Sequence, residues 1–402
     1  MRGEIIAIGD ELTSGVRLDT NSQWLAQQLG DLGIDVLYHT AVGDELEPMV
    51  DVMKIAARRA DVIVCTGGLG PTADDLTRDA LARCNEVPLV QNDDVLNHIR
   101  GIYSRRKRPM PQRNIVQAMF PEGSRVIPNP HGTAPGIDID LGENSPAGKT
   151  SRLFALPGVP AEMKEMFATT VAPAILEIIP PQQRRIIRHR RLKCFGVGES
   201  DLEAMLPDVI ARDRYPRVGI TVSKATITLR VTAQEVDETA CLAAMEPTIA
   251  TIRQCLGELV FGEEDDELHH VVGRLLAARK LTLATAEQYT GGLLAGWLAS
   301  IPDTERISRG GRLLASDACR TPEDVEKLAA NLRKETLADF ALVIGALDTP
   351  DPTGEGSIHF ALASAEAVTS FRSPDIGHPD IRQARLAKAA LDALRKHLAS
   401  PA

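Results

Sequence analysis

The stretch from Cys65 to Thr77 reads CTGGLGPTADDLT and combines two chemical features that repel each other electrostatically. Its glycines and threonines offer bare backbone N–H groups, a common way to bind an anion at the start of a helix. Two carboxylates, Asp74 and Asp75, follow directly. A divalent cation that bridges one of these acids to phosphate oxygens would remove the conflict. With oxygen ligands alone, Mg²⁺ or Mn²⁺ would be the natural choice.

A purely structural role is the alternative for the same residues. Thr72 and Asp75 have the spacing of a capping box, in which Asp75 is the third residue of a helix. The glycines would then only allow a tight turn. Because one carboxylate is enough for a cap, the second acid favours a phosphate and metal site, and both interpretations stay open at this point.

Two more turns with glycine and acids follow predicted strands in the same part of the chain. Gly9-Asp10-Glu11 ends the apolar run EIIAI, and Gly43-Asp44-Glu45 ends IDVLYHTAV. Strand and helix patterns alternate here, which predicts an α/β domain with a parallel sheet covered by helices on both faces. Ligands of such sheets bind at the carboxyl ends of the strands. The three acidic turns are therefore expected to form one site.

A second loop of similar character is NPHGTAPG, from Asn129 to Gly136. It also presents glycine, threonine and backbone N–H groups, and it could hold a sugar or a second phosphate. A plain turn that contains prolines accounts for the same residues equally well.

Three domains are expected, at 1–170, 171–262 and 263–402. A strand and a helix in LFALPGVPAEMKEMF close the first, after an exposed loop, DLGENSPAGKTSR. The basic segment RRIIRHRRLK is expected to be a solvated strand edge, and TVSKATITLRVTA a single strand. The acidic run GEEDDE at 262–267 marks the next boundary, and the last domain ends in a long helix.

Composition limits the function classes. Of the 402 residues, 44% are hydrophobic and 25% charged, as in ordinary globular proteins, and the net charge of −10 argues against a chain-wide nucleic-acid role. No apolar stretch approaches a membrane span, and the N-terminus turns polar too early for a signal peptide. The six cysteines form no C-x-x-C pair, which indicates neither a zinc site nor a disulfide framework and favours a reducing cytoplasm.

Four motifs together carry a family resemblance. GDELTSG, TGGLGPTADDLT, NPHGTAPG and LPGVPAEM resemble, in order and spacing, the CinA (competence/damage-inducible protein A) family. The resemblance implies three parts. They are an N-terminal three-layer parallel-sheet domain of the MoaB and MogA type with a molybdopterin-binding fold, a small α+β KH-like domain, and a C-terminal α/β domain of nicotinamide mononucleotide deamidases. It also implies a homodimer.

The resemblance further implies a metal-dependent ADP-ribose pyrophosphatase in the first domain, giving AMP and ribose 5-phosphate with Mg²⁺, Mn²⁺ or Co²⁺. Asp44, Asp74 and Asp75 are assigned to catalysis, and Asp75, Asp44 and Glu11 to the metal. Which acid acts as the general base stays undecided. The residues expected to bind phosphate or nucleotide are Gly67, Gly68, Gly70, Thr72, Asn114, Gly132 and Thr133, with Gln117 also matching the family.

The C-terminal domain departs from its family at the site itself. The deamidase motif is Ser-Cys-Thr-Gly-Gly with serine as nucleophile, but here Gln288 replaces the serine and Tyr289 the cysteine. Ala315 occupies the position of a tyrosine in the family, and Arg320 that of a lysine. The family's loop Thr-Gly-x-Ala-Gly-Pro is replaced here by IGALDT. Glutamine has no nucleophilic hydroxyl. The domain is therefore expected to keep the fold and to have lost the deamidase.

Three functional hypotheses follow. The first is a metal-dependent pyrophosphatase acting on ADP-ribose or a related nucleotide diphosphate. The second is a module that binds a molybdopterin or a nucleotide without hydrolysis. The third is an assembly scaffold with vestigial sites, which the intact N-terminal motifs disfavour.

Overall fold

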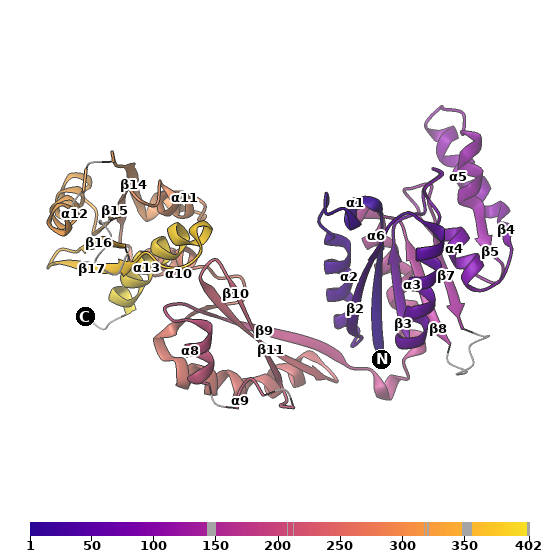
Figure 1. Cartoon of the computed structure of the whole chain (residues 1–402), viewed down its shortest axis with the longest axis horizontal. Helices are drawn as coiled ribbons and strands as arrows, with labels where there is room; N and C mark the ends of the chain where they lie inside the picture. Colours follow the sequence, from indigo (N-terminus) through magenta and orange to yellow (C-terminus); the bar gives the residue numbers. More distant parts are fainter. Residues whose placement is uncertain are drawn as a thin grey trace. The chain divides into compact units, whose positions relative to one another are not determined.

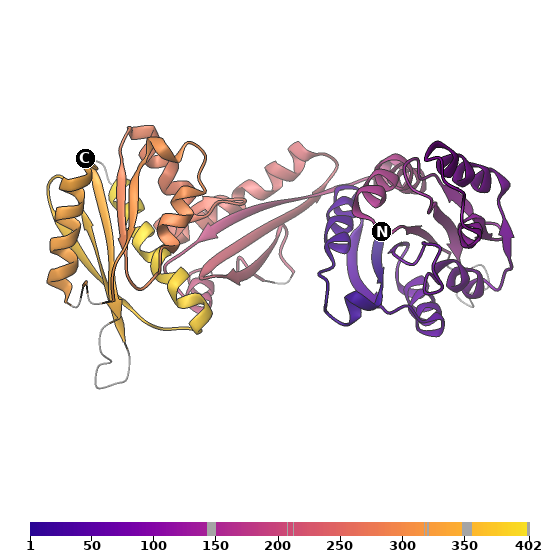
Figure 2. The same cartoon turned by 90° about the horizontal axis from the view of Figure 1, so that it is seen from above.

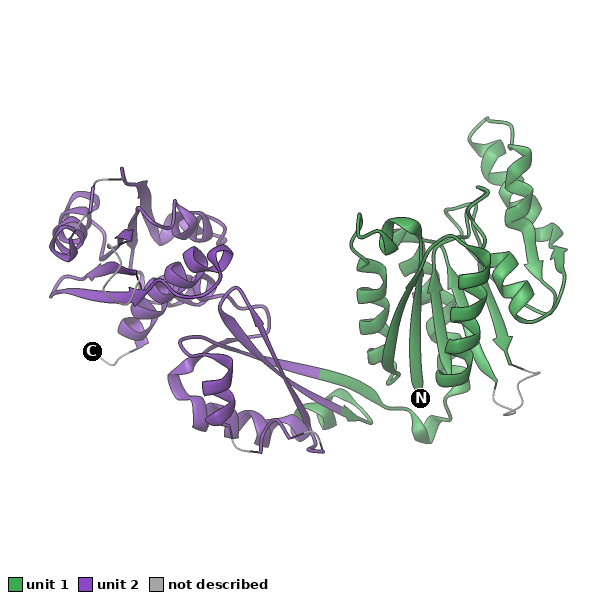
Figure 3. Ribbon diagram, in the orientation of Figure 1, with its two compact units in different colours: residues 1–188, 234–242 green, residues 189–233, 243–402 purple. Residues whose placement is uncertain are grey.

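The computed structural model describes residues 1–142, 150–206, 208–211, 213–316, 318–319, 321–347 and 356–399. The chain divides into two compact units, which Figure 3 colours separately. The first comprises Met1–Arg188 with Gln234–Leu242, and the second comprises His189–Ala233 with Ala243–Ala402. Each unit is described by itself below.

The first unit contains a six-stranded sheet in the order β2-β1-β3-β8-β7-β6. Its strands are β1 (Arg2–Ile8), β2 (Asp35–Val42), β3 (Val62–Thr66), β6 (Arg125–Ile127), β7 (Gly136–Leu141) and β8 (Ser151–Leu156). The expected parallel pairing is confirmed for β2, β1, β3 and β8, whereas β7 and β6 pair antiparallel. The loops before and after β7 are too short for the crossover that a parallel strand needs.

Helices cover both faces of this sheet, as Figure 1 shows, which confirms the three-layer expectation. One core joins Ile6 and Ile63 to α3 (Leu46–Arg59), α4 (Thr77–Cys84) and α5 (Asp93–Arg105). The other joins Ile5 and Val64 to α2 (Thr20–Asp31) and α6 (Pro160–Met166). Consecutive strand residues thus point to opposite cores. A short helix, α1 (Asp10–Thr13), a 3₁₀ turn, Gln112–Ala118, and α7 (Ala172–Ile178) complete the elements used below.

The loop expected over DLGENSPAGKTSR is shorter than its sequence suggested. Asp140 and Leu141 belong to β7, and Ser151 and Arg152 belong to β8. Asp138 on β7 binds Arg152 through two hydrogen bonds of 2.6 and 2.9 Å, so the two ends of this polar sequence belong to paired strands. Residues 143–149 of this loop lie outside the described part of the chain.

The middle domain is a four-stranded sheet in the order β10-β11-β9-β12 with α8 (Glu199–Ala204) and α9 (Glu238–Leu256). The single strand expected over TVSKATITLRVTA is wrong. β10 (Arg217–Ser223) and β11 (Thr226–Glu235) form a hairpin through Lys224 and Ala225, whose φ angles are +46° and +62°. Two-residue turns of this kind usually carry Asn or Gly, and Lys-Ala gives no such signal.

The basic segment is an interior strand, so its expected place at a sheet edge is wrong. β9 (Ile186–Cys194) lies between β11 and β12 (Val260–Glu263). Its arginines pair with the acidic run that begins in β12: Arg190 binds Glu263, and Arg191 lies 3.2 Å from Asp265. The two segments are far apart in sequence, so local patterns could not reveal that one neutralises the other.

The C-terminal domain has a five-stranded sheet in the order β14-β13-β15-β16-β17. Its strands are β13 (Leu283–Glu287), β14 (Ser308–Leu313), β15 (Phe340–Leu347), β16 (Ser357–Ala363) and β17 (Val368–Pro374). Figure 2 shows helices on both faces of this sheet. α12 (Pro322–Thr336) covers one face, and the other is covered by α10 (Leu268–Arg279), α11 (Leu293–Ala299) and α13 (Pro379–Ala399).

The expected long last helix is confirmed as α13. Its leucines face inward as predicted, with Leu386, Leu391, Leu394 and Leu398 at most 2% exposed. The same core includes Phe195 and Phe261 from the middle domain, so the middle and C-terminal domains share apolar packing. Among the described residues, no helix is both long enough and apolar enough to cross a membrane.

Candidate functional site

The three turns with glycine and acids meet at one edge of the first sheet. β2, β1 and β3 are neighbours and parallel, so their carboxyl ends lie side by side. The first two turns also bind each other directly. The backbone N–H of Asp10 donates to Oδ2 of Asp44, and the backbone N–H of Asp44 donates to Oδ1 of Asp10, each at 3.0 Å.

Asp44 lies in a concentration of negative charge. Burial raises its pKa most, and the charges of Asp10, Asp74 and Glu11 raise it further, against the opposing hydrogen bond from the N–H of Asp10. Each of these three side chains is therefore near enough to affect the ionisation of Asp44. A divalent cation between these acids and a phosphate would relieve their repulsion.

The glycine-rich loop after β3 requires glycine at two positions. Gly67 and Gly68 have φ angles of +111° and +64°, in the region that favours glycine. A Cβ on Gly67 would come within 2.3 Å of the carbonyl oxygen of Ile8, and one on Gly68 within 2.3 Å of Oγ1 of Thr77. The absence of a side chain at Gly67 therefore lets the loop lie close to the end of β1, where the first acidic turn begins.

Asp75 is bound by the loop itself. Its Oδ1 accepts from the N–H of Gly70 at 2.7 Å, and its Oδ2 accepts from the N–H of Thr72 at 2.8 Å and also from the Thr72 hydroxyl. α4 begins at Thr77, so the carboxylate closes a turn ahead of the helix and does not lie in its first turn. Both oxygens of Asp75 thus support the loop.

Asp74 lies differently from its neighbour. Its side chain is exposed, and the nearby Thr72 side chain is the main cause that lowers its pKa. Asp74 is thereby kept ionised beside the loop. The pair of acids thus divides into one that braces the loop and one that faces solvent.

Arg78 is a residue that sequence reasoning missed. It is 1% exposed, and its guanidinium donates to the carbonyl of Gly70 at 3.1 Å and also to that of Leu69. Burial lowers its pKa to about 10, while the charges of Asp75 and Asp79 oppose this shift. A buried positive charge therefore lies directly behind the glycine-rich loop. An arginine in the first turn of a polar helix gives no sequence signal of such burial.

Asn114 and Gln117 support the loop from another side. Both are buried, and Nδ2 of Asn114 donates to Oε1 of Gln117 at 2.8 Å. Nε2 of Gln117 in turn donates to the carbonyl of Leu69 at 3.4 Å. These two side chains therefore position the backbone of the loop.

The loop NPHGTAPG connects β6 to β7 and lies at the same edge of the sheet. β6 is antiparallel to β7, and β7 is antiparallel to β8, so β6 runs in the direction of β8. The loop is organised by the buried side chain of Asn129, which accepts from the N–H of Gly132 at 2.8 Å and donates to the carbonyl of Ala134 at 2.9 Å. Thr133 is partly exposed.

Glu162, in the first turn of α6, also belongs to this arrangement and was missed. Its Oε2 accepts from Nδ2 of Asn129 at 2.7 Å. A Cβ on Gly132 would lie 2.3 Å from the same oxygen, so a larger residue there would displace the Glu162 carboxylate. In the sequence, the only sign that Glu162 belongs to the site is that the motif LPGVPAEM, which contains it, resembles the family.

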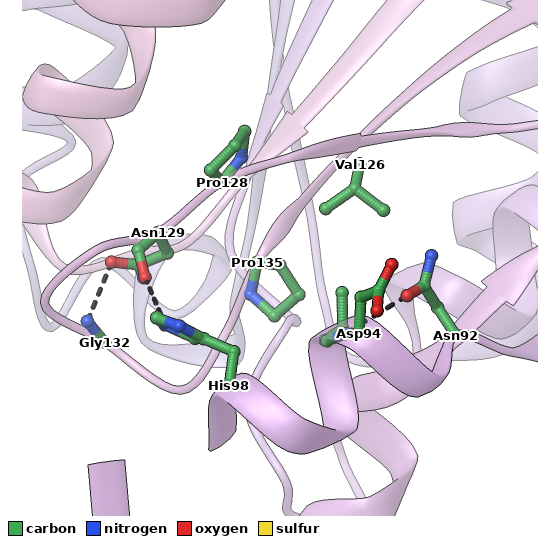
Figure 4. Close-up of a pocket in the computed structure, with 9 residues that line it drawn as sticks. Asn92, Asp94, His98, Val126, Pro128, Asn129, Gly132 and Pro135 are labelled. Carbon is green, nitrogen blue, oxygen red and sulfur yellow. Dashed lines mark hydrogen bonds between the residues drawn. The ribbon is translucent and has the colours of Figure 1, made fainter. Parts of the chain in front are cut away.

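Two hollows lie at this edge. A cavity of about 290 Å³ lies between α5 and the loop NPHGTAPG, and Figure 4 shows its lining. A smaller one, of about 40 Å³, lies at the ends of β1 and β3 and includes Glu11. Asn21 lines it and was also missed; its Nδ2 donates to Oγ1 of Thr66 at 3.1 Å and to the carbonyl of Gly158 at 3.0 Å.

In the described ranges, no three Asp, Glu, His or Cys side chains are arranged to hold a metal ion by themselves. Mg²⁺, however, is commonly held by one or two carboxylates and completes its octahedron with waters and substrate phosphates. The carboxylates around Asp44 have the right chemistry for such a shared site. The donor set therefore fits a hard divalent cation that binds together with a phosphate.

The corresponding turn in the C-terminal domain is filled by its own acid. Glu287, at the end of β13, is 1% exposed and accepts from the N–H groups of Leu294 at 2.9 Å and Ala295 at 2.8 Å. It also accepts from the Thr290 hydroxyl at 2.6 Å. The backbone donors at the start of α11 are thereby satisfied internally.

The residues at the expected deamidase motif are tied to their surroundings. Nε2 of Gln288 donates to the carbonyl of Ser316 at 2.7 Å. The Tyr289 hydroxyl donates to Oδ1 of Asp375 at 2.9 Å, and burial is the main cause that raises the pKa of Tyr289. Ala315 is exposed after β14, while Arg320 and the end of IGALDT lie outside the described residues.

Family models match three successive parts of the chain. One described as "Probable molybdopterin binding domain" matches residues 4–177. A second, "Damage-inducible protein CinA KH domain", matches 189–262, and a third, "CinA C-terminal domain", matches 265–321.

Known relatives are similar along nearly the whole chain. A "Putative competence-damage inducible protein" of Caldicellulosiruptor bescii is 35% identical, over 99% of this chain and 99% of its own. A "CinA-like protein" of Frankia casuarinae is 35% identical, over 99% of this chain and 96% of its own. The solved structure of the protein CinA from Thermoplasma acidophilum is 30% identical over 44% of this chain and 98% of its own, with a TM-score of 0.39. From the near-complete similarity to the first two relatives, the protein belongs to the CinA family, with an N-terminal domain of the molybdopterin-binding type.

Proposed function

We propose that the N-terminal domain hydrolyses ADP-ribose or a related nucleotide diphosphate to AMP and a sugar phosphate, with a divalent metal ion. The observation that carries the proposal is the concentration of acids around Asp44 beside a glycine-rich loop. Asp10, Glu11 and Asp74 all raise the pKa of Asp44. A fold has no structural need for this repulsion, whereas a metal and phosphate site needs these groups together.

The proposed roles follow from the position of each group. The backbone N–H groups of the glycine-rich loop bind a phosphate, and the buried charge of Arg78 behind the loop favours the anion. Asp44 and Glu11 hold Mg²⁺, Mn²⁺ or Co²⁺, which when bound polarises the phosphate and lowers the pKa of a water. Asp74, exposed and ionised, orients that water and accepts its proton.

Asp75 is proposed to position the loop. Its two oxygens accept from the donors of Gly70 and Thr72, at 2.7 and 2.8 Å for the backbone N–H groups. Removal of its charge would therefore loosen the loop that binds the phosphate. The sequence predicts Asp75 as a metal ligand, and the activity of an Asp75→Asn variant tests this prediction.

The proposal is tested by incubating the purified full chain with ADP-ribose and with Mg²⁺, Mn²⁺ or Co²⁺ in separate reactions. We expect AMP and ribose 5-phosphate in equal amounts with at least one metal, and none after chelation by EDTA. Chromatography measures AMP and the remaining ADP-ribose, with and without EDTA, and a sugar-phosphate assay measures ribose 5-phosphate. Recovery of unchanged ADP-ribose and other nucleotide diphosphates with every metal would contradict hydrolysis.

A second candidate function is binding of a molybdopterin or a nucleotide without hydrolysis. Two observations favour it: the family model for residues 4–177 describes a molybdopterin-binding domain, and Asp75 is occupied by its own loop. This function predicts saturable binding in calorimetry with ligand that is recovered unchanged. The same incubations therefore separate the two candidates.

For the C-terminal domain we propose a retained fold without deamidase activity. The position of the family's serine is Gln288, whose amide binds the carbonyl of Ser316 at 2.7 Å. The neighbouring phenol of Tyr289 has a raised pKa and so is a weaker nucleophile still. Release of ammonia from nicotinamide mononucleotide by the purified chain would contradict this proposal. The homodimer that the resemblance implies is checked by light scattering on the same sample.

A further inference from the structure

The cavity between α5 and the loop NPHGTAPG has a lining of distinct chemistry. Figure 4 shows His98 projecting from α5 toward Asn129, with Asp94 on the same helix beside Asn92. The apolar part of the lining is formed by Val95, Val126, Pro128 and Pro135. No lysine or arginine lines the cavity, and Asp94 adds a negative charge at α5. A phosphate is therefore disfavoured here, while a flat, neutral ring suits the apolar walls.

The two polar side chains that α5 contributes to the cavity, Asp94 and His98, offer hydrogen-bond acceptors. Nε2 of His98 lies 3.0 Å from the carbonyl oxygen of Asn129, and a carbonyl only accepts, so Nε2 carries the proton. In the neutral imidazole, Nδ1 is then an acceptor. A carboxylate such as that of Asp94 also only accepts. The matching ligand is a ring that donates hydrogen bonds, such as a base with an exocyclic amino group.

Two chains of contacts connect the cavity to the glycine-rich loop. On one side, Asn129 binds Glu162 at 2.7 Å, and α6 leads back to Gly158, where a Cβ would lie 3.7 Å from Cα of Gly67. On the other side, Gln117 donates to the carbonyl of Leu69 at 3.4 Å. The N–H of Asn92, which lines the cavity, donates to the carbonyl of Ala118 at 2.8 Å.

The distance between the glycine-rich loop and the cavity suits a single extended ligand. The glycine-rich loop follows β3, and the loop of the cavity joins β7 and β6, which are two and three strands away from β3. At the usual spacing between strands this is a reach of about 10–14 Å. A nucleoside joined to a diphosphate covers such a reach, whereas a lone phosphate or sugar does not.

We propose that this cavity binds the nucleobase of the nucleotide substrate, with Asp94 and Nδ1 of His98 accepting from an amino-bearing base such as adenine. This inference rests on the proposed function only in assuming that the diphosphate of the ligand binds at the glycine-rich loop. Binding of the base in the cavity is tested separately from hydrolysis. Asp94 is then a specificity-determining residue, and it takes no part in cleavage of the diphosphate.

Calorimetry with AMP and with IMP, whose base has a carbonyl in place of the amino group, tests the proposal on the full chain. Asp94→Asn should weaken AMP binding about tenfold, the loss expected for one hydrogen bond to a charged group. IMP should bind the wild type more weakly than AMP does. This preference should disappear in Asp94→Asn, because an amide can donate to the carbonyl of IMP.

Asp93→Asn is the matched control. Asp93 lies in the same first turn of α5, so its substitution removes an equal charge at the same place. Asp93 does not line the cavity, and its side chain accepts from Nε2 of Gln91 at 2.7 Å. Its AMP affinity should equal that of the wild type. Equal AMP affinities for the Asp93 and Asp94 variants, or an unchanged preference for AMP over IMP, would overturn the proposal.

A second variant, Val126→Phe, fills the cavity without changing its charge. Its Kd for AMP should rise at least tenfold, with an unchanged circular dichroism spectrum and melting temperature. If ADP-ribose is hydrolysed with an unchanged KM by all variants, the base site is wrong and hydrolysis stands. If AMP binding depends on Asp94 and Val126 but ADP-ribose is never cleaved, the base site stands and the proposed hydrolysis fails.

Discussion

The chain contains two glycine-rich turns from a central strand to a helix, after β3 and after β13, and they differ instructively. In both, a carboxylate of the chain accepts from backbone N–H groups of the turn: Asp75 in the first, and Glu287 in the second. A turn of this kind is therefore stable without a ligand. The first turn has additional acids beside it, while the second has side chains that bind their own domain.

The comparison shows that the glycine pattern alone is not a sign of chemistry. Glu287 is almost completely buried, and Gln288 and Tyr289 bind Ser316 and Asp375. Around the first turn, Asp74 and Glu11 are exposed, and Asp44 is held in a repulsive environment. Surplus, mutually repelling groups distinguish a turn proposed to act on a ligand from one that only supports the fold.

The largest expected effect is on hydrolysis in the first turn. Asp44→Asn should reduce the rate of ADP-ribose hydrolysis about 100-fold or more, because it removes a charge proposed to hold the metal. The folded-state pKa of Asp44 is raised, so the charge that Asp44 carries at higher pH destabilises the folded state relative to the unfolded chain. The neutral variant should therefore be at least as stable as the wild type at pH 7, as its melting temperature would show.

A matched control for this variant is Asp51→Asn on the exposed face of α3. It removes one equal charge from the same domain and should leave hydrolysis unchanged. Activity of Asp44→Asn equal to that of the control would mean that the first turn resembles the second and is only structural.

The second turn should respond in stability. Glu287→Gln replaces an acceptor of three hydrogen bonds with an amide and should lower the free energy of unfolding of the second unit by about 2–3 kcal/mol. Hydrogen exchange of the amides in β13 and α11 measures this effect. Unchanged protection there would mean that Glu287 does not hold the turn together.

The same substitution in the first turn should have a smaller effect on stability. Asp75→Asn should lower the free energy of unfolding of the first unit by about 1–2 kcal/mol, because Asp75 is more exposed than Glu287. ADP-ribose hydrolysis should fall less than in Asp44→Asn, as expected for a residue that positions the loop. A loss as complete as that of Asp44→Asn would favour Asp75 as a metal ligand.

Acid should weaken the second unit through His269 on α10. This side chain stacks on Trp297 with ring centroids 5.6 Å apart, and burial lowers its pKa to about 4. The unfolded chain binds a proton near pH 6.5 that the folded state resists, so stability is present above pH 6.5 and decreases as pH falls toward 4.

Because the imidazole is buried, we expect a loss of about 1–2 kcal/mol between pH 7 and pH 5. Hydrogen exchange of α10 at both pH values measures it. His269→Gln should remove this part of the pH dependence, and an equal dependence in the variant would assign it to other groups.

The smallest expected effect is on the lost chemistry of the second turn. The double variant Gln288→Ser and Tyr289→Cys restores the two motif residues but should release no ammonia from nicotinamide mononucleotide. Ala315 still stands where the family has a tyrosine. Measurable ammonia release would show that the loss rests on the motif alone.

Most of the N-terminal architecture could be predicted from the chain. Alternating strand and helix patterns led to a sheet covered on both faces. Asp19 caps α2 by accepting from the N–H of Ser22 at 2.8 Å, and Asp is a residue type typical of this position. The antiparallel pair β6 and β7 was missed, and so was the hairpin at Lys224. Pairing direction depends on loop length and on φ angles that these residue types do not signal.

The sequence by itself determined the family, the parallel core of the first sheet and the three acidic turns at its edge. Parallel strands must place their carboxyl ends together, and so the turns that follow them had to meet. The tertiary structure alone decided which acids are occupied and which are exposed. Asp75 binds Gly70, Glu162 binds Asn129, and Arg78 is buried behind the loop, because burial and partners arise from segments that are distant in sequence.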